Sequence, residues 1–183
     1  MQKVSLRKTK IATDYASLEN EKIMHFSLQD SLPPNSVLAL NKTFGTLSFL
    51  TCDERGYPRL ARQEQFTHTE MSVLLPLLEL FPYYCPYELL YANFYSGGKA
   101  TEQQQEEARK HLEEAEIEGT WEQEMRPIRC ALSRTRLKIR AFGIDISSIL
   151  ATGYILMVSH VAEEKSEEPA LTAAGPKWKQ ILA

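Results

Sequence analysis

The sequence predicts an α+β fold, in which a small antiparallel sheet is followed by helices and then by a β-hairpin. Three observations support this prediction. Residues 37–50 are rich in apolar and β-branched side chains, helical periodicity starts at Thr67, and a second β-rich segment covers residues 144–156. Strands, then helices, then strands again form the order of an α+β domain and not of a parallel α/β domain.

The bulk composition is that of a globular protein. The chain has 183 residues, of which 43% are hydrophobic and 25% are charged, and its formal net charge is -3. We expect one domain at 37–160, preceded by a flexible arm at 1–36 that holds a short helix at 14–27. A disordered tail is expected at 161–183, in which Trp178-Lys-Gln-Ile-Leu182 is a candidate docking segment.

The sequence carries no motif that is typical of a catalytic or metal site. It has no Gly-rich phosphate loop, no His-Glu-x-x-His and no Gly-x-Ser-x-Gly, so we expect no enzyme and no cofactor. Cys52, Cys85 and Cys130 form no Cys-x-x-Cys pair, which disfavours zinc and predicts free thiols in a reducing cytoplasm. No apolar run reaches the roughly 18 residues of a membrane span, so we expect no membrane partner.

The first strong helix is predicted to begin after Thr67. The run Thr67-His-Thr-Glu70 is a capping box, and Met71, Leu74, Leu75 and Leu78 follow at helical spacing. Pro76 lies inside this pattern, where it removes one hydrogen bond, so we expect a kink or disturbed last turns. Pro82 is expected to end the segment.

Two further helices are expected before the most basic segment of the chain. The first runs from about Pro86 to Tyr95 and is stopped by the glycines that follow it. The second covers 101–118, is rich in glutamate and glutamine, and is ended by Gly119. Such a helix is usually solvated, with a thin packing stripe. The stripe expected here consists of Ala108, Leu112, Ala115 and Ile117.

The helix expected at 127–142 is the most informative one. Residues 126–140 contain five arginines, one lysine and no acidic residue, although the chain as a whole is acidic. At 100° per residue, one side of this helix is apolar and faces the core, while basic side chains flank a neutral centre on the other side. The core-facing residues are Ile128, Ala131, Leu132, Thr135, Ile139 and Phe142. A basic helix followed by a hairpin at 144–156 is the layout of a winged helix-turn-helix domain, which binds nucleic acid.

The basic residues are therefore the candidate site, and helix 127–142 is expected to enter the major groove of double-stranded DNA. Phosphate contacts are expected from Arg126, Arg129, Lys138 and Arg140, and contacts at or near base edges from Ser133, Arg134 and Arg136. The alternative is that the arginines form surface ion pairs with the glutamates of 102–118. Both interpretations hold if the acidic helix masks the basic one until DNA displaces it.

Four short motifs occur in an order that resembles a known family. They are Phe66-Thr-His-Thr-Glu70 with Leu74-Leu75, Phe94-Tyr-Ser-Gly97, Ser133-Arg-Thr-Arg-Leu-Lys-Ile139, and Ala151-Thr-Gly-Tyr-Ile-Leu156. This order is similar to that of the OmpR/PhoB-type winged-helix DNA-binding domain, the effector domain of bacterial response regulators. The similar region covers 37–158 and implies an N-terminal antiparallel sheet, three core helices and a hairpin wing, with the acidic helix as an extra element.

The resemblance implies a bacterial, cytoplasmic transcription regulator that binds DNA sequence-specifically. It also implies contact with RNA polymerase through the 99–125 region, and a homodimer would suit repeated half-sites. No phosphoacceptor domain precedes the match, so control by phosphorylation within this chain is not expected. Leu150 replaces the usual arginine of the wing. This replacement, with the overall acidity, favours the alternative function, a winged-helix protein-protein interaction module that has lost DNA binding.

Overall fold

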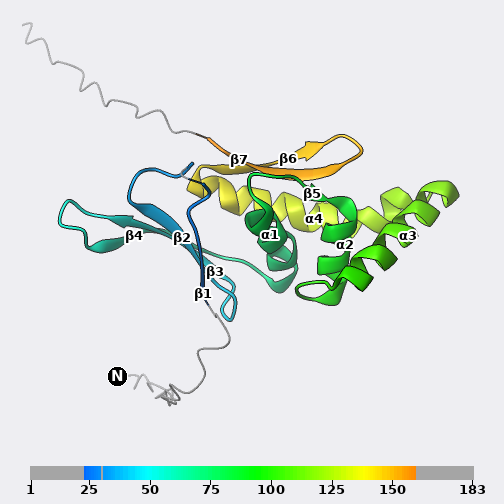
Figure 1. Ribbon diagram of the computed structural model, residues 1–183, viewed down its shortest axis with the longest axis horizontal. Helices are drawn as coiled ribbons and strands as arrows, with labels where there is room; N and C mark the ends of the chain where they lie inside the picture. Colours follow the sequence, from blue (N-terminus) through cyan, green and yellow to red (C-terminus); the bar gives the residue numbers. More distant parts are fainter. Residues whose placement is uncertain (1–22, 30, 160–183) are drawn as a thin grey trace, which may run out of the picture.

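The computed structural model describes residues 23–29 and 31–159, and this part has a mixed α+β fold with antiparallel sheets (Figure 1). Its elements follow in the order β1 (Ile23–Phe26), β2 (Ser36–Asn41), β3 (Thr46–Cys52), β4 (Pro58–Gln65), α1 (His68–Leu80), β5 (Cys85–Pro86), α2 (Tyr87–Ser96), α3 (Glu102–Glu118), α4 (Trp121–Ile139), a 3-10 turn (Arg140–Phe142), β6 (Ile144–Ile149) and β7 (Gly153–Val158). The α+β class predicted from the sequence is therefore confirmed.

The first sheet has the order β1-β2-β3-β4 and lies at one end of the molecule, while α3 lies at the other end (Figure 1). One face of this sheet packs on the helices. Leu38, Leu40 and Leu47 on β2 and β3 are completely buried on that face. β4 is an edge strand whose side chains are largely exposed, and a bulge opposite Phe49 and Leu50 interrupts its pairing with β3.

Strand β1 corrects the expectation for the start of the chain. The helix expected at 14–27 is wrong for Ile23–Phe26, which pair antiparallel with β2, and 14–22 lie outside the described residues. Met24 and Phe26 are opposite Leu40 and Leu38 in this pairing. Pairing with β2 and contact with the core override the local helical preference, because strand formation depends on what the side chains pack against. The folded part thus begins inside the segment expected to be a flexible arm.

Helix α1 begins where its capping box predicts. The Thr67 side chain accepts from the Glu70 amide, and the Glu70 side chain accepts from the Thr67 amide. Pro76 lies within the helix, which nevertheless continues to Leu80. Because Leu74, Leu77 and Leu78 are buried around the proline, core packing offsets the one hydrogen bond that it removes.

Helices α2 and α3 also agree with the sequence. Gly97 and Gly119 end them in the left-handed conformation, and a second capping box opens α3 at Thr101. α3 packs against α2 through a narrow stripe that includes Ala108 and Leu112. Ile117, which was expected in that stripe, is 87% exposed instead, since it lies on the solvated side of the helix.

Helix α4 is longer than predicted. It begins at Trp121 and contains Pro127, which was expected to be its first residue. At this position the proline deprives one carbonyl of its partner. However, the preceding turns are held by Met125, which is completely buried, and by Trp121, which packs against the core. All six residues expected on the core-facing side are buried, namely Ile128, Ala131, Leu132, Thr135, Ile139 and Phe142.

The hairpin β6–β7 lies along α4, and β7 also pairs with β5, which gives a second sheet in the order β5-β7-β6 (Figure 1). This pairing ties the hairpin to the connection between α1 and α2. It requires a glycine at position 153, because a Cβ there would lie 2.1 Å from the carbonyl oxygen of Cys85. Ala151 at the hairpin tip has a φ of 54°, in the left-handed region that favours glycine.

We predict that Gly153→Ala lowers the free energy of unfolding by about 2 kcal/mol, because the new methyl group forces β5 and β7 apart. Thermal and urea unfolding would measure the change. Gly98→Ala is the matched control, since an added Cβ at Gly98 meets no atom within 4 Å. Equal stability of the two variants would contradict the close β5–β7 approach.

Candidate nucleic-acid interface

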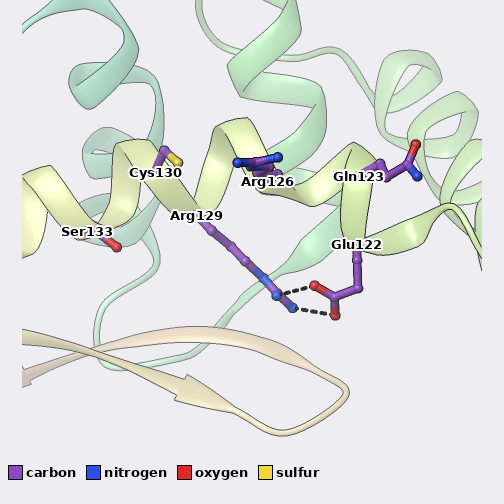
Figure 2. Close-up of a pocket in the computed structure, with 6 residues that line it drawn as sticks. All are labelled: Glu122, Gln123, Arg126, Arg129, Cys130 and Ser133. Atoms are coloured by element: carbon purple, nitrogen blue, oxygen red, sulfur yellow. Dashed lines mark hydrogen bonds and ion pairs between the residues drawn. The ribbon is translucent and has the colours of Figure 1, made fainter.

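The outer side of α4 carries the candidate site. Arg126, Cys130, Ser133 and Arg134 are exposed along this side, opposite the buried stripe. Figure 2 shows Arg126, Cys130 and Ser133 spaced along the helix, while the side chain of Arg129 extends away toward Glu122. The sequence prediction that α4 has a basic outer side and an apolar inner side is therefore correct. Which of the basic side chains lack a carboxylate partner depends on their contacts within α4 and with other elements.

Arg129 is held by the first turn of its own helix. Its guanidinium donates to both carboxylate oxygens of Glu122, with an Nη2–Oε1 distance of 3.2 Å (Figure 2). The same guanidinium lies 5.0 Å from the ring centroid of Trp121, within cation-π range. Arg129 is therefore an anchored side chain whose two terminal nitrogens both bond to a carboxylate.

Arg136 and Arg140 share one carboxylate, that of Asp145 at the start of the hairpin. Arg136 Nε lies 2.7 Å from Asp145 Oδ1, and Arg140 Nη2 lies 3.2 Å from Asp145 Oδ2. Partial burial acts to raise the pKa of Asp145, but hydrogen bonds from Arg140, Arg136 and the Ile146 amide outweigh it and lower the pKa to about 2. The carboxylate thus fixes the end of α4 to β6.

Lys138 points toward α1. Its Nζ lies 2.6 Å from Glu70 Oε2 and 2.9 Å from the Gln65 carbonyl oxygen. The Glu70 side chain is only 3% exposed. Burial acts to raise the pKa of Glu70, but the hydrogen bonds from Lys138 and from the Thr67 amide overcome it and lower the pKa. Lys138 therefore satisfies a buried carboxylate and also binds the carbonyl group of the last residue of β4.

The remaining candidates have no carboxylate partner within 23–29 and 31–159. Arg126 forms no ion pair there, and Arg134 donates only to the carbonyl oxygen of Cys130, at 3.3 Å. The Ser133 hydroxyl is exposed beside them. Three of the seven candidate residues thus have no carboxylate partner in the described ranges, while four bond to carboxylates.

The acidic helix does not provide those carboxylates. The described ion pairs of α3 link Arg109 to Glu88 and Glu106, Lys110 to Glu106, and His111 to Glu124. In the described part of the chain, none of the glutamates 102–118 pairs with an arginine of α4, so this interpretation is wrong and masking has no ion pair to support it. The partners are instead Glu70, Glu122 and Asp145.

A groove of about 410 Å³ lies between α4 and the hairpin. It combines cations, hydroxyl groups and apolar side chains, and several of its residues were not predicted as site residues. It is lined by Tyr87, Arg129, Leu132, Ser133, Arg136, Ile146, Ser148, Leu150 and Tyr154. Such a lining suits a sugar-phosphate chain, because phosphate needs cations and hydroxyl donors while sugars tolerate apolar contact.

Sequence reasoning missed the three carboxylates. Only the contact of Glu122 could have been predicted from the sequence, because Glu122 lies two helical turns before Arg129 and hence on the same side of α4. Glu70 was recognised as part of a capping box but not as the partner of Lys138, which is 68 residues away. Asp145 reaches α4 only because the chain reverses after the 3-10 turn.

Comparison with protein-family models, with curated proteins and with solved structures finds no match to this chain. What the protein binds must therefore be inferred from the charges and geometry of α4 and the hairpin. Within the described ranges, no group of His, Cys, Asp and Glu side chains is placed to hold a metal ion. Among the helices described there, none combines the length and apolar character that a bilayer crossing needs.

We predict that Lys138→Met lowers the free energy of unfolding by about 2 kcal/mol, because it leaves the buried Glu70 without its charged donor. Denaturant unfolding would measure this loss. Adding Glu70→Gln should restore part of it, since the amide needs no cation. Lys110→Met on α3 is the control, as its ion pair with Glu106 is exposed. A loss equal to that of the control would contradict a structural role for Lys138.

We also predict that the stability difference between wild type and Asp145→Asn depends on pH. The folded-state pKa of about 2 lies below the ordinary value of 3.8, so the folded protein binds this proton less tightly than the unfolded chain. The carboxylate therefore stabilises the fold fully above the ordinary pKa, and its contribution is lost as pH falls toward 2. Urea titrations across this range should show the two proteins converging at low pH. A pH-independent difference would contradict the Arg136–Asp145–Arg140 contact.

Proposed function

We propose that the protein is a winged-helix regulator of transcription, similar to OmpR/PhoB-type effector domains, that binds double-stranded DNA with α4 in the major groove. The order of elements supports this proposal. A four-stranded sheet precedes α1, α2 and α4, and a hairpin follows α4 and pairs with β5. The proposal includes a bacterial origin and a cytoplasmic location of the protein.

One observation carries the proposal, namely the exposed row of Arg126, Ser133 and Arg134 on α4, for which the described residues offer no carboxylate. Two free guanidiniums on one exposed helix face in a chain of net charge -3 are most simply accounted for by an anionic partner. The intervening Cys130 and Ser133 are small, so the helix can approach base edges while the arginines meet phosphates.

Arg136 joins this group by a different route. Asp145 binds only its Nε, so the two terminal nitrogens form no hydrogen bond to the described residues. The carboxylate thus orients the guanidinium at the edge of the groove between α4 and the hairpin. An oriented arginine loses less side-chain entropy when it binds, which favours a bidentate contact with a guanine or a phosphate.

Arg129, Lys138 and Arg140 are weaker candidates for phosphate contact. A phosphate would have to compete with Glu122, Glu70 or Asp145, and removing Lys138 from the buried Glu70 is the most costly of these exchanges. We therefore assign the main electrostatic contribution to Arg126, Arg134 and Arg136.

The proposal also includes two protein partners. The acidic 99–125 region would contact RNA polymerase, and a second copy of the chain would form a homodimer on repeated half-sites.

A second candidate function is a protein-protein interaction module built on the same scaffold. The observation that favours it is Leu150, which is 93% exposed at the hairpin tip, where the resemblance implies an arginine. A large exposed apolar side chain at a projecting tip suits a protein partner better than a phosphate chain. Charge reversal on α4 separates the two candidates, because it would abolish DNA binding and leave such a partner bound.

We predict that the wild-type protein binds a mixed-sequence DNA duplex with a steep salt dependence. The double variant Arg126→Ala/Arg134→Ala should reduce the log-log salt slope by about 2, one for each lost phosphate contact. Fluorescence anisotropy across a salt series would measure both slopes.

The matched control is Arg109→Ala/Lys110→Ala, which removes two cations from α3 instead. It should leave the slope unchanged, because α3 lies outside the proposed interface. Failure of the wild-type protein to bind duplex DNA at low salt would exclude the DNA-binding proposal and favour the interaction module.

A further inference from the structure

A groove of about 550 Å³ lies between α3, the start of α4 and the tip of the hairpin. Its apolar lining comes from three separate elements and from the connection between the two hairpin strands. The apolar lining residues are Tyr87, Leu112, Trp121 and Leu150. Leu150 is 93% exposed, so the apolar wall that it forms is in contact with water.

The rim of this groove is negatively charged. Four glutamates and two arginines line it. Glu88 is paired with Arg109 and Glu122 is paired with Arg129, so these charges are largely compensated. Glu113 and Glu116 form no ion pair with any residue of the described ranges. An occupant that fits the groove must therefore supply apolar side chains together with positive charge.

The chain itself contains a segment of this chemistry. Residues 176–182 read Pro-Lys-Trp-Lys-Gln-Ile-Leu, and no acidic residue occurs from Pro169 to Ala183. Residues 1–10 are also basic, but they contain no aromatic side chain. Tryptophan offers the largest apolar surface of any side chain, and it is enriched where one end of a contact is apolar and the other is wet.

We propose that residues 177–182 of this chain dock into the groove between α3 and the hairpin tip. Trp178 packs against the apolar wall that includes Leu150, and Lys177 and Lys179 pair with Glu113 and Glu116. This inference does not rest on DNA binding, because none of its contacts requires an anionic partner. It gives the exposed Leu150 an apolar contact within the same chain.

The length of the chain permits this contact. β7 runs from the hairpin tip to Val158, and its six residues span about 20 Å. The residues from 160 to 175 can span about 50 Å when extended. The segment therefore reaches back past the full length of β7 without strain. A covalent connection of this length also keeps the segment at a high effective concentration near the groove.

The test uses the full chain with Trp121→Phe, which keeps an aromatic ring in the groove and leaves Trp178 as the sole tryptophan of the two in the sequence. Acrylamide quenching of Trp178 is compared with that of a free peptide of residues 175–183. We expect quenching severalfold weaker in the protein, together with blue-shifted emission. Quenching equal to that of the peptide would overturn the proposal.

Groove variants then locate the contact. Leu150→Asp, and separately Glu113→Lys/Glu116→Lys, should raise quenching to the level of the peptide. The matched controls are Ile117→Asp, at an exposed residue that does not line the groove, and Glu114→Lys/Glu118→Lys on the same helix. Protection that survives the groove variants would overturn the proposed site. Protection that disappears on dilution would overturn docking within one chain, because it would show that the segment binds a second copy.

Discussion

The burial of one side of α4 is the constraint on which the rest of the structure depends. Ile128, Thr135 and Ile139 are completely buried, so the rotation of the helix about its axis is fixed within narrow limits. This rotation decides which basic side chains meet solvent and which meet protein. The contact of Lys138 with Glu70 adds a polar restraint in the last turn of α4. It also links α4 to the capping box that starts α1.

Three carboxylates from different parts of the chain then divide the basic charge of α4. Glu122, on the same helix, binds Arg129. Glu70 of α1 binds Lys138, and Asp145 of the hairpin binds both Arg136 and Arg140. The result is a helix with anchored cations on its flanks and free ones along its outer side. A nucleic-acid partner would meet a small number of accessible charges held on a rigid support, which is the arrangement that preorganised recognition requires.

The hairpin connects these features to the other end of the molecule. Gly153 allows β7 to pair closely with β5, and this pairing holds the hairpin beside α4 so that Asp145 reaches the two arginines. The hairpin tip then projects toward α3 and forms one wall of the groove there. A single strand pairing therefore positions both the groove beside α4 and the groove beside α3.

The sequence by itself determined the α+β class, the capping box at Thr67, the glycine stops and the buried stripe of α4, because each depends on residues that are near one another in the chain. It failed at Ile23–Phe26 and at the start of α4, where contacts with β2 and with the core outweigh local preference. Only the tertiary structure decided which arginines are free. The charge of a side chain is local, but its partner is set by folding, as the separation of Lys138 from Glu70 by 68 residues illustrates.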